Sequence, residues 1–245
     1  MKLGVGITTR NRIDVLEHSL INFVKYMDDS HEILVVDDNS DTDCFSVLGD
    51  KFPDIEFIYN KERKGVAKSK NVIISRFQDK DGVILFDDDC FPYQPNWTQH
   101  FVKACVQHNQ HHMVYAQEPQ ITIERRFEYA DAWLGCLGVC IFLSKKAIKT
   151  IGGFEPKFGL YGFEHHELTG RCYVAGLSPM GVYVTPKNMS EYIWCFDLRG
   201  DHEGYKWPCK GCMSEDEKKV ALDYNTRVTV DIRTNPQLGF YRKFE

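Results

Sequence analysis

The sequence predicts an α/β fold in which a mostly parallel central sheet is flanked by helices. In the first half of the chain, short hydrophobic runs alternate with longer stretches of helical periodicity. Alternation of this kind is typical of parallel strands joined by covering helices. Polar clusters follow three of the predicted strands, at the edge where open α/β sheets bind ligands. The 245 residues are enough for one large domain with a well-buried core.

The first half of the chain supplies the elements of this sheet in order. The hydrophobic runs predict strands at residues 3–8, 32–36, 55–58, 83–86 and 114–116. The intervening stretches predict helices at residues 12–27, 42–49, 65–77 and 95–108. The first of these helices shows the expected spacing, because Leu16, Leu20 and Phe23 recur on one face.

The second half of the chain is less regular. A strand is expected within residues 135–143 and a helix at residues 164–175. Residues 200–216 are polar and carry Gly, Pro and Lys, which predicts a long loop. Loops of that length in compact domains are often lids, so we expect this segment to close over a ligand.

Composition and charge narrow the class of protein. The formal net charge of −5 gives no support for binding nucleic acid through a basic surface. No signal peptide is visible, and no apolar stretch approaches the roughly 20 residues that cross a bilayer, so no stable membrane insertion is expected. The nine cysteines are odd in number and lie mostly in hydrophobic runs, as in a reduced cytoplasmic protein. Cys209 and Cys212 are half of a tetrahedral zinc site or part of a plain loop.

An acidic cluster, Asp87, Asp88 and Asp89, directly follows the predicted buried strand at residues 83–86. Adjacent carboxylates repel one another unless a cation or water compensates their charge. Hard cations such as Mn²⁺ or Mg²⁺ prefer oxygen ligands and often bridge to substrate phosphates. A solvated acidic turn is the alternative, but the position after a buried strand favours a metal site.

Two further polar clusters end the first and second strands. Residues 37–40, Asp-Asp-Asn-Ser, can cap a helix or can hold a nucleobase or ribose, and both can be true at once. Residues 8–12, Thr-Thr-Arg-Asn-Arg, open a helix and favour an anion, with simple capping as the alternative. A dinucleotide-binding dehydrogenase is a rival interpretation, because Gly4 and Gly6 form a GxG. These glycines lie inside the strand, however, and a third glycine is missing.

Taken together, these motifs resemble the family 2-like GT-A glycosyltransferases. The resemblance spans about residues 3–180 and rests on several segments. They are residues 7–12, the VVDDNS run at residues 35–40, the series Asn60, Gly65, Ala67 and Asn71, the strand ending in DxD at residues 84–89, and GGFEP at residues 152–156 followed by YGFE at residues 161–164.

The resemblance implies a metal-dependent glycosyltransferase that moves a sugar from a nucleotide diphosphate sugar to an acceptor hydroxyl, and the family pattern favours a UDP-linked donor. It implies one GT-A domain with a nucleotide-sugar half at residues 1–117, an acceptor-side half at 118–199, and a mobile loop with the C-terminal segment at 200–245. The implied metal ligands for Mn²⁺ or Mg²⁺ are Asp87, Asp89 and His202, although an exposed loop histidine is the alternative for His202. The implied donor-binding residues are Thr8, Arg10, Asp37, Asp38, Asn60, Gly65, Lys68, Asp88 and Trp207.

The sequence departs from the family pattern at Glu164-His165-His166-Glu167, where inverting members carry Glu-Asp with the Asp as general base. We predict that Glu164 and His165 act together as the base, since imidazole can accept a proton near neutral pH. His165 could instead bind metal or contact the donor, or these histidines could lie on a solvated helix face. Inverting and retaining stereochemistry both stay open.

Two alternatives from other functional classes are kept. One is a catalytically silent relative that binds a nucleotide-sugar or carbohydrate, which the loss of the usual Asp at His165 would permit. The other is a different nucleotide-binding α/β enzyme, such as a nucleotidyltransferase or a dehydrogenase. The sequence does not choose among a saccharide, a lipid-linked sugar, a protein and a modified DNA base as the acceptor.

Overall fold

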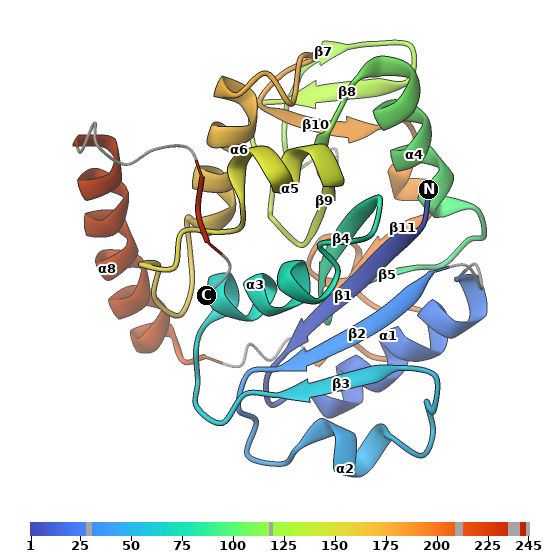
Figure 1. The fold of residues 1–245 in the computed structure, drawn as a ribbon. Helices are drawn as coiled ribbons and strands as arrows, with labels where there is room; N and C mark the ends of the chain where they lie inside the picture. Colours follow the sequence, from blue (N-terminus) through green and yellow to red (C-terminus); the bar gives the residue numbers. More distant parts are fainter. Residues whose placement is uncertain (28–30, 118–119, 209–212, 235–240, 244–245) are drawn as a thin grey trace.

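The computed structural model describes residues 1–27, 31–117, 120–208, 213–234 and 241–243. A central sheet runs through these residues (Figure 1). Its six strands lie in the order β3 (Glu56–Tyr59), β2 (Glu32–Asp37), β1 (Leu3–Thr9), β4 (Gly82–Asp87), β9 (Cys140–Ser144) and β6 (His112–Val114). The first four strands are parallel, and β9 is antiparallel to both of its neighbours. The predicted mostly parallel sheet is confirmed.

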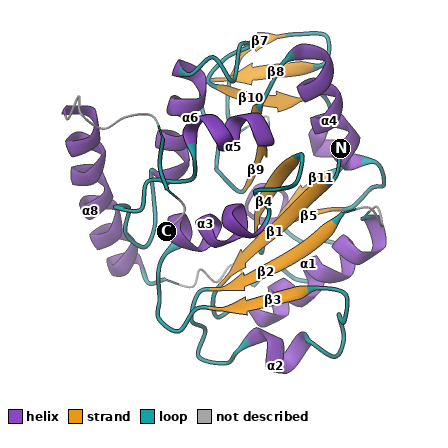
Figure 2. Cartoon of the chain, in the orientation of Figure 1, coloured by secondary structure: helices purple, strands orange, loops and turns teal. Residues whose placement is uncertain are grey.

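Helices cover both faces of this sheet (Figure 2). The core on one face packs side chains of α1 (Ile13–Tyr26), α2 (Cys44–Leu48) and α4 (Trp97–His108) against β1, β2 and β4. The core on the other face packs α3 (Val66–Arg76), α5 (Lys145–Ile151) and α6 (Glu164–Val174) against β2, β4 and β9. Neighbouring strand residues therefore belong to opposite cores, as Val35 does on one face and Val36 on the other.

The GxG of the first strand has a packing role. Cβ atoms added at Gly4 and Gly6 would overlap the side chains of Phe77 and Ile73 beneath the sheet. The two glycines therefore let α3 approach β1 closely, rather than forming a turn around a dinucleotide. This accounts for the motif without a dehydrogenase.

Several short elements had no counterpart in the sequence prediction. Two small antiparallel sheets flank the main one, with the orders β10 (Tyr183–Pro186), β8 (Ala130–Trp133), β7 (Ile123–Arg126) and β11 (Ile193–Cys195), β5 (Cys90–Pro92). A 3-10 turn, η1 (Met189–Glu191), precedes β11, and the single-turn helix α7 (Phe196–Arg199) follows it. The strand expected within residues 135–143 is β9, and that expected at 114–116 is β6, two residues earlier.

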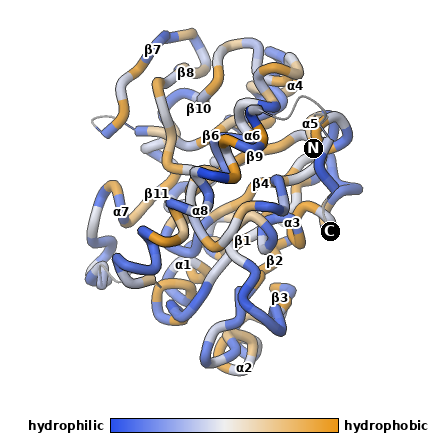
Figure 3. The backbone as a smooth tube through the Cα atoms, turned by 90° about the vertical axis from the view of Figure 1, so that its left-hand side faces the viewer, coloured by the Kyte–Doolittle hydropathy of each residue, from blue (hydrophilic) through white to orange (hydrophobic). Residues whose placement is uncertain are grey.

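The C-terminal segment contains a 20-residue helix, α8 (Glu215–Thr234), that begins inside the segment predicted to be a loop. Its hydropathy alternates along the chain (Figure 3), and its buried residues are only Ala221, Asn225 and Val228. Asn225 joins it to the loop before α6, where its Oδ1 accepts from the Gly159 N–H at 2.7 Å. None of the helices in the described part of the chain is long and apolar enough to cross a membrane.

Candidate active site

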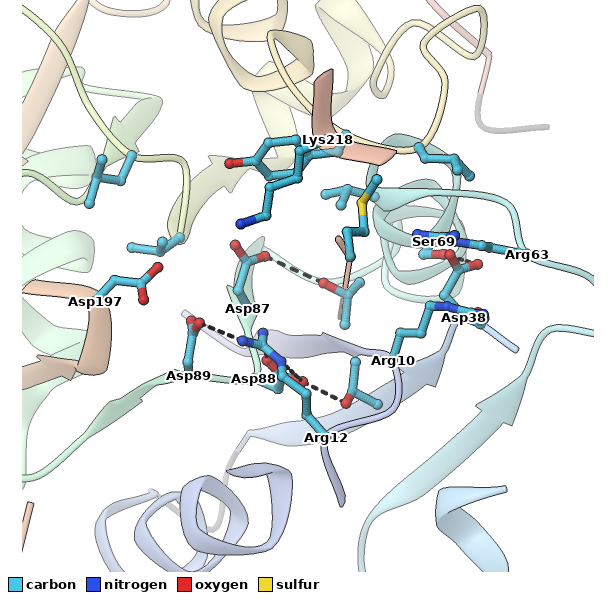
Figure 4. A pocket seen from close by; sticks show the side chains of 18 of the residues that line it. Arg10, Arg12, Asp38, Arg63, Ser69, Asp87, Asp88, Asp89, Asp197 and Lys218 are labelled. Carbon is cyan, nitrogen blue, oxygen red and sulfur yellow. Dashed lines mark hydrogen bonds and ion pairs between the residues drawn. The ribbon is translucent and has the colours of Figure 1, made fainter. Parts of the chain in front are cut away.

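A cavity of about 350 Å³ opens at the carboxyl ends of β1, β2 and β4 (Figure 4). That volume lies within the range of small-molecule sites. All three polar clusters of the sequence contribute side chains to it, as the parallel sheet predicts. Its charged lining consists of the cations Arg10, Arg12, Arg63 and Lys218 and the acids Asp38, Asp87, Asp88, Asp89 and Asp197.

The acidic cluster is compensated in part by Arg12. Its guanidinium forms ion pairs with Asp88 and with Asp89 Oδ2, the latter at 3.0 Å. Asp88 also accepts a hydrogen bond from Thr9 Oγ1 at 2.6 Å. Burial raises the pKa of Asp88, and it raises the pKa of Asp89 to about 7 despite the opposing effect of Arg12. The buried Asp89 Oδ1 meets no hydrogen-bond partner among the described residues.

Asp87 is paired with a buried lysine that was not predicted as a site residue. Lys70 Nζ lies 2.8 Å from Asp87 Oδ1 and donates to the Gly138 carbonyl at 3.1 Å. Burial opposes the charge of Lys70, but the Asp87 carboxylate outweighs it and raises the lysine pKa. Thr8 Oγ1 lies 3.5 Å from the same Asp87 oxygen. Lys70 therefore holds Asp87 in one orientation at the floor of the cavity.

These acids fit a hard divalent cation that is shared with a substrate. Asp89 offers an unpartnered buried oxygen, Asp87 is partly exposed to the cavity, and Asp197 of α7 lies on the same side (Figure 4). Mg²⁺-type cations are commonly bound by one or two carboxylates together with substrate phosphates. Asp87 and Asp89 are therefore suited to hold Mn²⁺ or Mg²⁺ against a diphosphate.

The other side of the cavity is organised by Asp38. Its Oδ1 accepts from the Lys64 N–H at 2.8 Å and from Ser69 Oγ at 3.0 Å, and its Oδ2 accepts from the Gly65 N–H at 2.9 Å. Asn60 Nδ2 also donates to Oδ1, at 3.1 Å. These bonds fix the turn before α3 and leave Oδ2 with capacity for a further donor.

Gly65 is required by that turn rather than by the cavity surface. Its φ is +86°, and an added Cβ would lie 2.6 Å from the Gly159 carbonyl oxygen. Arg10 joins the turn from β1, because its Nη1 donates to the backbone carbonyls of Asp38, at 2.8 Å, and Asn39. Arg10 lines the cavity, whereas Asn60 and Gly65 support it from behind.

Besides Asn60 and Gly65, the structure places three further predicted donor or metal residues, Asp37, Lys68 and His202, away from the cavity lining. Asp37 accepts hydrogen bonds from the Ser40 and Cys44 N–H groups, so its carboxylate serves the turn into α2. Lys68 is exposed on α3. His202 is buried, with its Nδ1 3.1 Å from His18 Nε2 and its ring against Phe91. The tight turn that pairs His202 with Tyr205 directs it there.

Trp207 does line the cavity, stacked on Phe196 with ring centroids 4.8 Å apart. Met213 and Lys218 line it from further along the chain. Cys209 and Cys212, predicted as half of a zinc site or a plain loop, lie outside the described residues. Nothing in the printed sequence marks Lys218, because it belongs to a charged run that is typical of a solvated helix face.

Glu164 and His165 lie beside the cavity, not in its lining. His165 Nδ1 is 3.7 Å from Glu164 Oε1, and Glu164 Oε2 is buried without a hydrogen-bond partner among the described residues. Tyr161, which lines the cavity, lies close enough to Glu164 for the carboxylate to raise the tyrosine pKa, after the larger effect of burial.

Comparisons with known proteins identify relatives of this chain. The chain matches the family model for glycosyl transferase family 2 over residues 4–152. An uncharacterised glycosyltransferase of Acanthamoeba polyphaga mimivirus is 29% identical over 196 residues, covering 73% of this chain and 76% of that protein.

Solved structures share the fold at low sequence identity. S. aureus TarS 1–349 in complex with UDP-GlcNAc has a TM-score of 0.62 at 15% identity, covering 96% of this chain and 68% of that one. The mannosyltransferase PcManGT from Pyrobaculum calidifontis with GDP-Man and Mn²⁺ has a TM-score of 0.57 at 16% identity, covering 76% and 55%. GalNAc-T7 with UDP, GalNAc and Mn²⁺ has a TM-score of 0.56 at 15% identity, covering 69% of this chain. This chain spans 40% of the GalNAc-T7 chain.

The fold is that of the GT-A glycosyltransferases. Within that class the match is specific, because the family model covers more than half of the sequence. The chain belongs to glycosyl transferase family 2. The resemblance predicted from its motifs is confirmed.

Proposed function

We propose that this chain uses Mn²⁺ or Mg²⁺ to transfer a sugar from a nucleotide diphosphate sugar, with a UDP-linked donor favoured, to an acceptor hydroxyl. The observation that carries the proposal is the cavity in which Asp38 lies on one side and Asp87 with Asp89 on the other (Figure 4). A single extended ligand with a hydrogen-bonding base and a charged diphosphate matches both sides.

The side of the cavity around Asp38 suits the nucleoside. Within the described part of the chain, Asp38 Oδ2 accepts one hydrogen bond, from the Gly65 N–H, so a base N–H or ribose hydroxyl can also donate to it. Arg10 and Arg63 line the same side and can contact the ribose or the adjoining phosphate. Such charge-assisted bonds are stronger than neutral ones and would fix the register of the donor.

The side around Asp87 and Asp89 suits the diphosphate and its cation. When bound, the cation would stabilise negative charge that develops on the leaving diphosphate. Lys70 keeps Asp87 oriented, and Arg12 compensates Asp88 and Asp89. Lys218 reaches the cavity from α8 and can meet a phosphate oxygen. The solved structures support this assignment, because the PcManGT complex contains GDP-Man and Mn²⁺, and the GalNAc-T7 complex contains UDP, GalNAc and Mn²⁺.

On the acceptor side, we propose Glu164 as the group that accepts the proton of the attacking hydroxyl. Its Oε2 has no hydrogen-bond partner among the described residues, and Tyr161, three residues earlier in the chain, lines the cavity. His165 was predicted to act together with Glu164. Its Nδ1 lies 3.7 Å from Glu164 Oε1, and we propose that it positions the Glu164 carboxylate. Trp207 lines the cavity and is proposed to cover the sugar. The polar stretch that begins at residue 200 and carries Trp207 would then close over the donor and exclude water.

A donor-hydrolysis assay tests the proposal directly. The purified chain is incubated with UDP-, GDP- and other nucleotide-linked sugars, with Mn²⁺, Mg²⁺ or EDTA, and released nucleoside diphosphate is measured. We expect release from a UDP-sugar with Mn²⁺, abolition by EDTA, and a loss of roughly 10²-fold or more in Asp89→Asn. Asp50→Asn, an exposed acid outside the cavity lining, is the matched control and should match the wild type.

The outcomes separate the alternatives. One outcome is that calorimetry detects donor binding but no hydrolysis follows, and no sugar is transferred to saccharide, lipid-linked, peptide or hydroxymethylated DNA acceptors. That outcome would show that the chain is a catalytically silent relative. Turnover that EDTA leaves unchanged would disprove metal dependence. Binding of no nucleotide-sugar at all would overturn the proposal.

We also propose that the protein works in a reducing compartment such as the cytoplasm. The seven cysteines in the described residues are all free and buried. Disulfides form and persist mainly in oxidising compartments. Alkylation of unfolded protein from its native source should label every thiol, and a disulfide-linked peptide in the mass spectrum would contradict this.

A further inference from the structure

Beside the donor cavity, three side chains with nitrogen and sulfur ligands converge. One ligand atom from each of Cys136, His165 and His166 lies within 4.8 Å of the other two. Cys136 comes from the loop before β9, and the two histidines begin α6. In the described part of the chain, one other group of such residues is as compact, and it consists of Asp37, Asp43 and Cys44.

The two groups differ in what their ligand atoms already do. In the second group, both oxygens of Asp37 accept backbone hydrogen bonds, and Asp43 caps α2 by accepting from the Phe45 N–H. In the first group, the buried His165 Nε2 meets no hydrogen-bond partner among the described residues. The His165 ring interacts with the Cys136 thiol, but its Nε2 has no conventional hydrogen-bond partner among the described residues. Buried polar atoms of folded proteins are normally paired, and a metal ion between the thiol and the two imidazoles would supply the partner.

The rings are also oriented as they are in metal sites. His165 presents its other nitrogen, Nδ1, to Glu164 Oε1 at 3.7 Å, and His166 Nδ1 lies 2.8 Å from the Tyr183 hydroxyl. Metal-bound histidines usually engage their second nitrogen with a carboxylate or another polar group, which fixes the tautomer and the ring orientation. In both histidines this leaves Nε2 for the metal.

We propose that Cys136, His165 and His166 bind a Zn²⁺ ion, separate from the hard-cation site at Asp87 and Asp89. Zinc takes Cys and His ligands in tetrahedral sites, at about 2.3 Å for sulfur and about 2.0–2.1 Å for nitrogen. These bond lengths require ligand atoms roughly 3.3–3.7 Å apart, so the three groups would contract slightly around the ion. A water molecule fills the fourth position, and the Cys136 thiol releases its proton to solvent on binding.

The zinc ion would stabilise the floor of the donor cavity. Gly138 packs on the ring of His165, because an added Cβ would lie 2.6 Å from His165 Cγ. The Gly138 carbonyl accepts from Lys70, and Lys70 pairs with Asp87. Fixing Cys136 to α6 therefore restrains the loop that orients Asp87. The zinc site needs no assumption about the sugar donor. A negative result in the metal-binding test below therefore leaves the proposed transferase activity open, and a negative hydrolysis assay leaves the zinc site open.

Cobalt substitution is the test, because thiolate-bound Co²⁺ absorbs in the near ultraviolet whereas Co²⁺ bound by carboxylates does not. The assay uses the full chain carrying Cys209→Ser and Cys212→Ser, which removes the CxxC as a source of signal. We expect one equivalent of Co²⁺ to give this band together with tetrahedral visible bands, and Zn²⁺ to displace it. Mn²⁺ should not displace it, since soft ligands disfavour that ion.

Variants then assign the ligands. Cys136→Ser should abolish the thiolate band, and His166→Asn should weaken Co²⁺ and Zn²⁺ binding by at least about tenfold, as should Tyr183→Phe, which removes the partner of His166. Cys105→Ser is the matched control, because its buried thiol lies 3.6 Å from His111 Nδ1 without a second histidine. It should keep the band unchanged.

Two results would overturn the zinc site, and the first does not depend on whether a ligand variant folds. One is absence of a thiolate band in the Cys209→Ser, Cys212→Ser protein itself. The other is an unaltered band in folded Cys136→Ser. Zinc should raise the melting temperature of this protein and of Cys105→Ser, because an ion that binds the folded state stabilises it by mass action. It should not raise the melting temperature of His166→Asn.

Discussion

Two adjacent aspartates, Asp37 and Asp38, do different things at the end of β2. Asp37 holds the turn into α2, and Asp38 lines the cavity while binding the turn before α3. Since side chains alternate along a strand, neighbours at its end point in different directions. The sequence placed both residues in the nucleotide site, because a motif gives residue type and spacing but not which neighbour turns inward.

Substituting these two aspartates should separate the two roles. Asp38→Ala should weaken UDP binding roughly tenfold to a hundredfold, because a charge-assisted hydrogen bond contributes about 1.5–3 kcal/mol. Asp37→Ala should lower the free energy of unfolding, by leaving the Ser40 and Cys44 N–H groups unpaired, while UDP affinity stays within about threefold of wild type. Calorimetry with UDP and urea unfolding measure the two effects. Equal losses of affinity in both variants would show that Asp37 also contacts the nucleotide.

The sequence does not reveal some individual site residues, because only the folded chain brings them to the cavity. Lys70 is a buried cation only because α3 brings it under Asp87, and Asp197 reaches the cavity from a single-turn helix. Neither position belongs to a strand-end cluster. Arg12 did lie in a cluster predicted to bind an anion. Its partners in the structure are the carboxylates of Asp88 and Asp89 rather than a ligand.

At the scale of elements, the sequence predicted the parallel strands and their helices well and the C-terminal third poorly. The central strands β1 and β4 of the main sheet are buried on both faces and carry continuous hydrophobic runs. By contrast, α8 buries three residues, one of them the polar Asn225, so its apolar pattern is too thin to detect.

Asn225 should be the main attachment of α8 to the donor cavity. Its side chain accepts from Gly159 N–H and donates to the carbonyls of Tyr161 and Gly162, at 2.8 and 2.7 Å. Asn225→Ala leaves these buried groups unpaired, so we expect a loss of roughly 2–3 kcal/mol in stability. Hydrogen exchange should quicken at residues 157–163.

Thr226→Ala is the control for this variant. Its exposed hydroxyl bonds only to the Leu222 carbonyl within its own helix. Exchange at residues 157–163 should then stay at the wild-type rate. Comparable acceleration in both variants would mean that α8 is held by its helix packing rather than by Asn225.

His112 in the edge strand β6 should make the free energy of unfolding fall in mild acid. Burial lowers the pKa of His112 to about 4, against an ordinary imidazole value of about 6.5. The folded state therefore binds the proton less readily than the unfolded state. The free energy of unfolding should decline as pH falls below about 6.5, until the folded histidine also titrates near pH 4.

Comparison with His112→Gln isolates this effect, because every other titratable group is shared. Between pH 7 and pH 5, the wild type should lose about 2 kcal/mol more than the variant in urea unfolding. Gln retains an amide that can reach Thr169 Oγ1, the 3.0 Å partner of His112 Nε2. Parallel pH profiles for the two proteins would disprove the assignment.

At the scale of the whole molecule, the predicted halves at residues 1–117 and 118–199 share one sheet. Strand β9 from the second half lies between β4 and β6 of the first half, and β4 pairs with it along five residues. The core on the α1 face likewise combines residues from both halves. The division into halves is a matter of ligand roles, not of independent folding.

A fragment of residues 1–117 should therefore not fold alone. It would expose one edge of β4, and β6 would lose the neighbour with which it pairs. We expect circular dichroism to show no cooperative thermal transition, whereas the full chain should unfold cooperatively. A sharp transition in the fragment would show that the parallel strands suffice for a stable unit.

The cavity wall contributed by Asp197, Trp207, Met213 and Lys218 lies beyond residue 152, where the match to the family model ends. If the proposed function holds, part of the donor site is therefore encoded outside the stretch that matches the family model. Recombination or saturation mutagenesis confined to these four codons could retune which sugar is accepted while leaving the strands that carry Asp38 and Asp87 untouched. Such a library would offer a short evolutionary route from one donor preference to another.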